Sequence, residues 1–283
     1  MLVKVKFPVL FLSFNLIFLA AFSQDKIDVF VKDSLGKPLP YVSVIWGRSI
    51  GLVTDTVGHL QIPNTTKIDS LIVSAIGFNT LIVKKQDIFG KDNIQLVLHS
   101  AEIILPEVII ANYSVESDFG ITDSKKQTSY IKNDICTNLQ GALRIKDYSY
   151  PSQCKSISVF IAKQSSSEIP YRIRLYDINE NDLPGKDLIS ENLIVNSYKT
   201  NEWNIYNLDS LNVQLPQNGF FAAIEWLCSD IKSKNGLCVG LTNKAEGNST
   251  YYRYGSSGWI QLRYNSEINK DNIMIKVKIA SVK

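Results

Sequence analysis

The sequence has very few of the side chains that enzymes use most often as general bases and metal ligands. Only two histidines occur, His59 and His99, and a Gly-x-Ser-x-Gly motif is absent. A zinc hydrolase needs a set such as two histidines and a carboxylate, and a serine or cysteine nucleophile needs a nearby base. The 27 acidic residues leave open a hydrolase that works with two carboxylates, but no motif singles out a pair. We therefore predict a non-enzyme with no catalytic residue, no metal site and no cofactor.

An excess of charge of one sign is also missing. Lys and Arg number 30 against 27 Asp and Glu, which gives a formal net charge of +3. Residues 1–23 hold two lysines and no acidic residue, so their removal leaves +1. Proteins that bind nucleic acids normally carry a strongly basic surface. We therefore expect no nucleic-acid partner.

Long apolar runs are absent after the first 23 residues. Lys4 and Lys6 precede an apolar stretch over residues 7–22, and small residues follow at the positions that signal peptidase reads. This stretch of about 15 residues is shorter than the roughly 20 that span a bilayer as a helix. We predict a signal peptide over residues 1–23 with cleavage before Gln24, and the alternative is an uncleaved membrane anchor. The mature protein is expected to be exported and to have no transmembrane segment.

Cysteine is scarce, and all four cysteines lie within residues 128–283: Cys136, Cys154, Cys228 and Cys238. In an oxidising compartment four cysteines can form two disulfides in three connectivities. The simplest is the local pairing of Cys136 with Cys154 and of Cys228 with Cys238, because each bridge closes a short loop. The alternative is buried free thiols, which behave as small apolar side chains. Spacing alone does not decide between these possibilities.

What the sequence does contain is a long series of short apolar runs with period-two alternation, separated by Gly, Pro, Asn and Asp. This pattern is typical of β-strands. About seven runs occupy residues 24–111 and about nine fill residues 128–283, with no convincing helix among them. Residues 112–127 are polar and poor in large apolar side chains, which is typical of a linker. The sequence therefore predicts an all-β protein with two domains.

Turn glycines and prolines in the first domain follow a recognisable order. The pattern consists of Val29-x-Val31-x-Asp33-x-x-Gly36-Lys37-Pro38-Leu39-Pro40-x-Val42-x-Val44, Gly51-x-x-Thr54-Asp55-x-x-Gly58-x-x-x-Ile62-Pro63 and Asp69-Ser70-Leu71-x-Val73-Ser74-x-Ile76-Gly77-Phe78. It resembles the carboxypeptidase regulatory-like domain, although His59 stands where that family usually has an aromatic residue. The resemblance implies a small seven-stranded, transthyretin-like sandwich over residues 26 to about 99.

The same resemblance implies a place in the Gram-negative envelope, because this domain also occurs as an N-terminal extension of TonB-dependent transporters of the outer membrane. We expect a periplasmic, outer-membrane-associated or cell-surface location. Residues 128–283 are predicted to form a larger, jelly-roll-like β-sandwich. Their arrangement is similar to the C-terminal half of envelope proteins that carry a regulatory-like domain, and this similarity implies no known activity.

Aromatic residues gather around a Gly-Ser-Ser-Gly loop near the C-terminus. Aromatic faces can stack on sugar rings and an arginine can donate hydrogen bonds, so Tyr252, Tyr254, Trp259 and Arg253 are the candidate ligand-binding residues. Alternation places Tyr252 and Tyr254 on one face of their strand and Tyr251 on the other. The alternative is cross-strand aromatic packing inside the sandwich.

These observations together predict a non-catalytic envelope protein that acts as a binding or structural module through two β-sandwich domains. The partner is expected to be another envelope protein or a glycan. The alternative function is that of a carbohydrate-binding module that captures polysaccharide.

Overall fold

The computed structural model describes residues 26–47, 49–65, 67–101, 112–122, 127–230, 236–243, 249–262 and 271–283. The predicted signal peptide lies outside these described residues. Strands dominate, and the short 3-10 helices in the described part are η1 (Lys85–Asp87) and η2 (Asp209–Leu211). The prediction of an all-β protein is thereby confirmed. Among the described residues no helix has the length and hydrophobicity of a membrane span.

The N-terminal sandwich consists of two facing sheets. One has the order β4 (His59–Pro63), β1 (Lys26–Asp33), β7 (Asn93–Leu98). The other has the order β3 (Ile50–Val53), β2 (Ser43–Trp46), β5 (Ser70–Ser74), β6 (Leu81–Lys84). Strand β1 pairs antiparallel with β4 and parallel with β7. Alternate residues of β1, such as Ile27, Val29 and Val31, are buried in the core between the sheets, as period-two patterning predicts.

The C-terminal sandwich is larger and also has two sheets. The first has the order β13 (Pro184–Asp187), β12 (Pro170–Ile178), β17 (Phe220–Trp226), β10 (Gln140–Ile145), β19 (Thr250–Arg253), β20 (Ile260–Gln261), and β14 (Ile194–Asn196) also pairs with β12. The second has the order β21 (Asn272–Ile273), β18 (Cys238–Thr242), β11 (Ser152–Ile161), β22 (Ile275–Ser281), β8 (Val115–Gly120). Strands β15 (Glu202–Asn207) and β16 (Gln214–Leu215) pair with β11, and β9 (Ser129–Lys132) pairs with β18.

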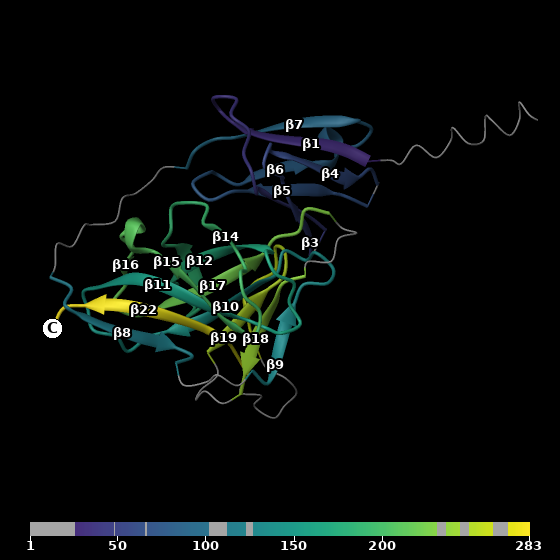
Figure 1. Cartoon of the computed structure of the whole chain (residues 1–283). Coiled ribbons are helices and arrows are strands. Elements are labelled where there is room, and N and C mark those ends of the chain that lie inside the picture. The colour runs from purple at the N-terminus through teal and green to yellow at the C-terminus, as the bar shows by residue number, and fades with distance from the viewer. Residues whose placement is uncertain are drawn as a thin grey trace, which may run out of the picture.

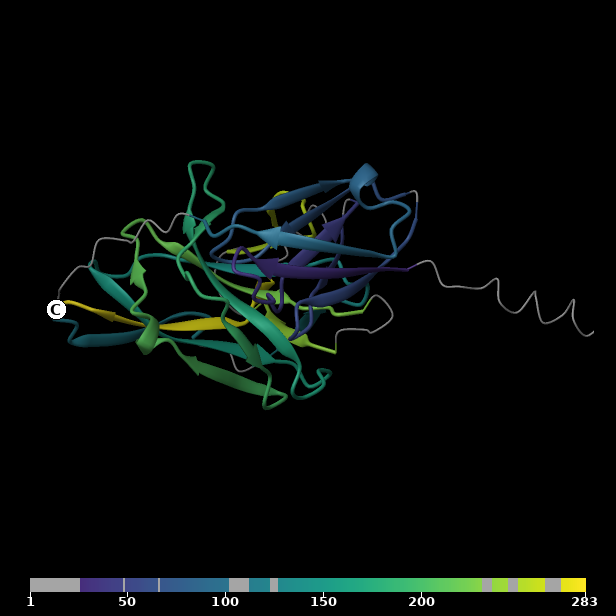
Figure 2. The same cartoon turned by 90° about the horizontal axis from the view of Figure 1, so that it is seen from above.

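The two sandwiches pack against each other (Figures 1 and 2), and β3 lies on the side of the N-terminal sandwich that is next to the C-terminal one (Figure 1). Two backbone hydrogen bonds cross the junction: Gly51 N donates to Cys136 O at 2.9 Å, and Val53 N donates to Cys228 O at 2.7 Å. The free edge of β3 is therefore satisfied by loops of the C-terminal sandwich. Because an unpaired strand edge exposes backbone donors and acceptors, this contact joins the two domains through main-chain atoms.

The cysteine pairing differs from the simplest prediction. A disulfide joins Cys136 to Cys228, whose Cα atoms are 5.5 Å apart, while Cys154 and Cys238 are free and buried. Neither local bridge forms, because β10 and β17 are neighbours in the sheet and bring the loop before β10 next to the loop after β17. The disulfide packs among the core side chains of the N-terminal sandwich. Burial raises the pKa of the free Cys154 thiol to about 12, which suits an unreactive core residue.

The region predicted as a linker, residues 112–127, also differs from expectation at one point. Residues 115–120 form strand β8, which pairs antiparallel with β22 at the edge of the second sheet. Its side chains are mostly exposed, and Lys276 and Lys278 of β22 lie opposite acidic residues of β8. A polar edge strand has almost no apolar periodicity, which is why composition alone indicates a linker.

Two turn glycines offer a matched test of the N-terminal turns. Gly58 has a φ of +74° in the turn before β4, and a Cβ there would lie 2.5 Å from Val31 O. Gly36 has a φ of +83°, but a Cβ there would meet no atom within 4 Å. We expect Gly36→Ala to lower the free energy of unfolding by about 1 kcal/mol, the cost of a left-handed residue with a side chain. Gly58→Ala should cost about 3 kcal/mol or more, because a backbone clash is added. Equal losses in urea unfolding would contradict this account.

The disulfide leads to a second expected outcome. A bridge across 92 residues restricts the unfolded chain strongly, so the Cys136→Ser, Cys228→Ser double variant should lose about 4 kcal/mol of unfolding free energy. The matched control is Cys154→Ala, a buried free cysteine whose replacement removes only packing. Peptide mapping of the alkylated native protein should recover one bridged peptide pair, and Cys154 and Cys238 should react only after denaturation. Mapping that recovers the two local bridges would contradict the observed pairing.

Candidate functional site

The face of the sheet around β17 that points away from the C-terminal core carries charged side chains, and some of them are buried. In β17, Phe220, Ala222, Ile224 and Trp226 point into the sandwich core, so Phe221, Ala223 and Glu225 point outwards. The register aligns Glu225 with Arg172 of β12 on one side and with Gln140 of β10 on the other. Gln140 is aligned in turn with Arg253 of β19. Four polar side chains therefore form one row across four strands.

Glu225 is the centre of this row and is completely buried, with an exposed fraction of 0%. Arg172 Nη1 lies 2.8 Å from Glu225 Oε1, and Arg174 Nη1 lies 3.2 Å from Glu225 Oε2. Gln140 Nε2 donates to Oε2 at 3.1 Å. Both carboxylate oxygens thus accept charged or amide donors, which is what a buried carboxylate requires.

The N-terminal sandwich completes the coordination of this carboxylate. Ser43 Oγ of β2 donates to Glu225 Oε1 at 3.1 Å, and Arg172 Nη2 donates to the carbonyl oxygen of Tyr41. Arg172 Nε donates to Asn192 Oδ1 at 2.7 Å. The Arg172 side chain is 3% exposed and has its donors distributed over both domains. We define Tyr41, Ser43, Arg172, Arg174, Gln140 and Glu225 as the junction network.

The electrostatics of the network favour an ionised Glu225. Burial by itself would raise its pKa, but Arg172, Arg174 and Arg253 outweigh burial and lower the pKa to about 2. Asp187 behaves in the opposite way: burial raises its pKa above the ordinary value, although Arg174 Nη2 lies 2.6 Å away. Glu225 is therefore negatively charged at neutral pH and holds two arginines at the domain boundary.

A cavity of about 320 Å³ opens beside the network, between the two sandwiches. Its wall is mostly polar and comes from both domains. The N-terminal side supplies Ser43, Ile45, Ile72, Ser74, Ala75, Ile76 and Thr80, and the C-terminal side supplies Asn138, Gln140, Arg172, Arg174, Glu225, Arg253, Gly255 and Ser256. We call this space the junction cavity. Its size and its position at a domain interface are typical of small-ligand sites, and its wall is more polar than that of most such sites.

The four ligand-binding residues predicted from sequence are divided by the strand alternation. Tyr252 packs against the inner core, and its ring contacts Tyr254 edge to face at 5.3 Å between centroids. Arg253 points to the outer face, where its guanidinium lies 5.0 Å from the centre of the Trp259 ring. The structure therefore brings Arg253 and Trp259 together and leaves the two tyrosines on the other side of the strand.

Aromatic packing on the outer face is edge to face. Trp259 meets Tyr176 at 5.7 Å with an interplanar angle of 71°, and Phe221 meets Tyr251 at 5.2 Å with an angle of 85°. Tyr176 and Phe221 are buried, and Tyr251 and Trp259 are half-buried. Such packing stabilises the sheet face, and it does not present coplanar exposed rings for a sugar to stack on.

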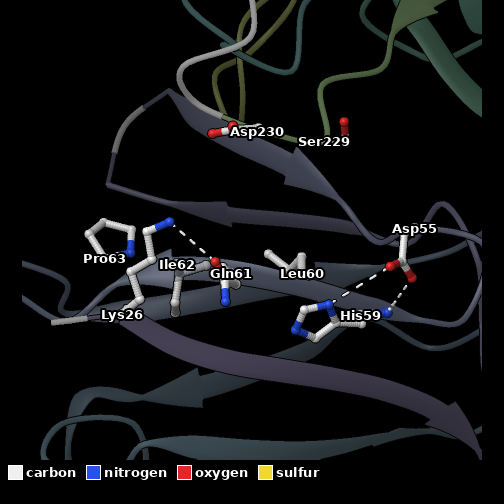
Figure 3. A pocket seen from close by; sticks show the side chains of 9 residues that line it. All are labelled: Lys26, Asp55, His59, Leu60, Gln61, Ile62, Pro63, Ser229 and Asp230. Carbon is white, nitrogen blue, oxygen red and sulfur yellow. Dashed lines mark hydrogen bonds and ion pairs between the residues drawn. The ribbon is translucent and has the colours of Figure 1, made fainter. Parts of the chain in front are cut away.

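Two other cavities also lie at the domain boundary. One, of about 450 Å³, is lined by β4 residues including His59 and Gln61 and by Ser229 and Asp230 of the C-terminal sandwich (Figure 3). His59 is fixed there, since its Nε2 lies 2.8 Å from Asp28 Oδ1 and its backbone N donates to Asp55 Oδ1. The other, of about 990 Å³, is lined by residues of both domains from Ser49 to Asp271, among them Lys132 and the predicted Tyr254.

Comparison with known proteins adds little about function. No family model and no curated protein matches the chain. Among solved structures, the cysteine protease and lectin-like domains of Cwp84, a surface layer associated protein of Clostridium difficile, have a TM-score of 0.43 at 10% identity over 86% of this chain and 59% of that chain. Clostridial cysteine protease Cwp84 after propeptide cleavage has a TM-score of 0.43 at 11% identity over 86% and 66%. The chain thus spans less than two thirds of either structure, and similarity at this level says nothing about function.

Sequence reasoning did not find the junction network, although the sequence contains a signal for it. Arg172 and Arg174 alternate with apolar residues in a strand that is otherwise buried, and Glu225 interrupts the apolar run from Phe220 to Trp226. Charged residues are almost never fully buried without a partner. A glutamate and two arginines in strands of this kind therefore indicate a buried ionic network, even before the strand order is known.

Replacement of Glu225 tests the network directly. Glu225→Gln keeps the shape but leaves Arg172 and Arg174 without their shared carboxylate, so the free energy of unfolding at pH 7 should fall by about 3 kcal/mol or more. The control Glu202→Gln changes an exposed glutamate of β15 and should change stability by less than about 0.5 kcal/mol. Urea unfolding monitored by tryptophan fluorescence measures both values.

The pH dependence of the same pair gives an independent check. Because the folded-state pKa of Glu225 lies below its ordinary value of 4.5, ionised Glu225 stabilises the fold fully above about pH 4.5. This contribution disappears as the pH falls towards about 2. The stability difference between the wild type and Glu225→Gln should therefore shrink over this range. The raised pKa of Asp187 acts in the opposite direction, but its largest cause is burial, which both proteins share. A difference that stays constant from pH 7 to pH 2 would contradict the assigned shift.

Proposed function

We propose that this protein is an exported, non-catalytic binding module of the cell envelope, and that its ligand binds in the junction cavity. The observation that carries the proposal is the construction of this cavity: both domains supply its wall, and a fully buried ionic network holds part of that wall in place. Side chains fixed by packing and hydrogen bonds are the ones that recognise a ligand at low entropic cost.

The non-catalytic part of the proposal is supported by where the histidines lie. His59 is held between two aspartates on β1 and on the turn before β4, and His99 lies on the surface with its Nδ1 3.0 Å from Ser34 Oγ. Neither histidine lines the junction cavity. Among the described residues, no group of three or more His, Cys, Asp or Glu side chains is arranged to hold a metal ion.

The envelope location is supported by the N-terminal sequence pattern and by the resemblance to the carboxypeptidase regulatory-like domain. The two facing sheets β4-β1-β7 and β3-β2-β5-β6 have the strand number that this resemblance implies. In this proposal the N-terminal sandwich acts as one wall of a shared site, which is why its β2 and β5 strands face the C-terminal sandwich at Ser43 and Ser74.

Carbohydrate is the second part of the proposal and gives the class of ligand. The cavity is of a size that holds one or two sugar units, and its neutral polar side chains, among them Asn138, Gln140 and Ser256, can exchange hydrogen bonds with hydroxyl groups. Recognition in this proposal proceeds through hydrogen bonds inside the cavity. The outer-face aromatics support the sheet and do not form a stacking platform.

A cavity-blocking variant tests the proposed function. Ser256 is exposed and lines the junction cavity, so the Trp side chain of Ser256→Trp should fill its entrance. The control Ser167→Trp places the same side chain on an exposed loop that lines none of the three cavities. On a glycan array the mature chain, residues 24–283, and the control should bind the same glycans, and Ser256→Trp should bind at least about tenfold more weakly. Equal binding by all three proteins would place the site elsewhere, and no binding at all would contradict carbohydrate as the ligand.

A further inference from the structure

Among the described residues, the charges around the junction cavity do not balance. Three arginines, Arg172, Arg174 and Arg253, line it together with one carboxylate, Glu225. A second carboxylate, Asp187, accepts from Arg174 Nε at 2.7 Å. Arg172 and Arg174 thus share two carboxylates between them. Within the described residues this leaves one guanidinium at the cavity without a carboxylate partner.

Arg253 is that guanidinium. Among the described residues no carboxylate oxygen lies within ion-pair distance of it, and its Nε is buried without a hydrogen-bond acceptor. Its identified contact is with the face of the Trp259 ring, 5.0 Å from the guanidinium carbon. The register fixes its position opposite Gln140, one strand away from Glu225. Trp259 therefore holds the side chain in place, and no carboxylate among the described residues pairs with it.

Arg144 differs from Arg253 in charge pairing alone, because its Nε is also buried without an acceptor. Arg144 lies on the same face of the same sheet, and its guanidinium carbon is 6.0 Å from the centre of the Phe221 ring. Unlike Arg253, it forms an ion pair with both carboxylate oxygens of Asp182. Arg144 does not line the cavity. Two arginines with similar surroundings thus differ in charge pairing, and the one at the cavity is the unpaired one.

An unpaired guanidinium in a partly buried site has unsatisfied donors that a planar anion can satisfy. Carboxylates fit the fork of an arginine with two parallel hydrogen bonds, and such charge-assisted bonds are about twice as strong as neutral ones. The neutral side chains that line the same cavity, Ser74, Asn138 and Ser256, offer donors and acceptors for hydroxyl groups. One wall thus suits a carboxylate and the other suits a polyhydroxylated ring.

We propose that the junction cavity binds an acidic sugar of the uronic acid class, with its carboxylate on Arg253 and its hydroxyl groups on the neutral polar wall. This inference rests on the proposed function, because it names the ligand class of the same cavity. The sugar is either a free monosaccharide or the terminal unit of an acidic polysaccharide, and both sources present the same carboxylate and hydroxyl groups.

Isothermal titration of the mature chain, residues 24–283, tests the inference with three probes at equal ionic strength. Sodium glucuronate should bind, glucose should bind at least about tenfold more weakly, and sulfate should not reproduce the affinity of glucuronate. Oligogalacturonate that binds better than glucuronate would identify a polysaccharide end as the source, and glucuronate alone would identify the free sugar. Either result supports an acidic sugar ligand.

Three variants connect the binding to Arg253. Arg253→Gln should weaken glucuronate binding at least about tenfold and bring it close to that of glucose, because the charge-assisted bonds are lost. Arg253→Lys keeps the charge but not the planar fork, so it should recover part of the affinity. The matched control, Arg144→Gln, should leave glucuronate binding unchanged. Thermal unfolding of each variant verifies that the protein is folded before its affinity is compared.

The remaining outcomes separate this inference from the proposed function. If glucose and glucuronate bind equally, and Ser256→Trp weakens both while Arg253→Gln weakens neither, then the cavity binds neutral sugars and the acidic ligand is wrong. If sulfate binds as tightly as glucuronate and depends on Arg253, then the cavity recognises a simple anion and the sugar is wrong. If glucuronate does not bind to the folded protein, the inference is overturned, and the comparison of Ser256→Trp with Ser167→Trp still decides the proposed function.

Discussion

The buried carboxylate of Glu225 is the constraint on which the domain arrangement depends. A fully buried charge is expensive unless charged and polar partners surround it, and the partners of Glu225 come from both sandwiches. The N-terminal sandwich contributes Ser43 and, through Arg172, the backbone oxygen of Tyr41. Displacement of that sandwich would open the network to water and remove those partners. The ionic network therefore specifies how the two domains meet, while the apolar cores specify each domain.

The disulfide adds a covalent constraint at the same boundary. Cys136 and Cys228 belong to loops of the C-terminal sandwich, yet they pack into the core of the N-terminal one. The carbonyl oxygens of the same two residues accept hydrogen bonds from β3. A bridge at this place holds together the two loops that complete the edge of β3. Main-chain hydrogen bonds, a buried ion network and a disulfide thus act on one surface, and the three cavities described above open around it.

Strand alternation explains both what was predictable about the candidate site and what was not. The period-two pattern of residues 250–254 separates Tyr252 from Arg253 whichever way the strand faces, so the two could never belong to one surface. Which face is the inner one depends on the neighbours of β19, and those neighbours come from distant parts of the chain. The row of Arg172, Glu225, Gln140 and Arg253 exists only because four strands align in one register.

The sequence by itself determined the all-β class, the turn glycines of the N-terminal sandwich and the approximate number of its strands, because these features depend on local φ preferences and on alternation within a few residues. The edge strand β8 was not determined in this way, since a polar edge has no apolar period. The pairing of Cys136 with Cys228, the ion pairs of Glu225 and the isolation of Arg253 were decided only by the tertiary structure. Each depends on atoms brought together from residues tens of positions apart, and strand order and register, which position them, are properties of the whole sheet.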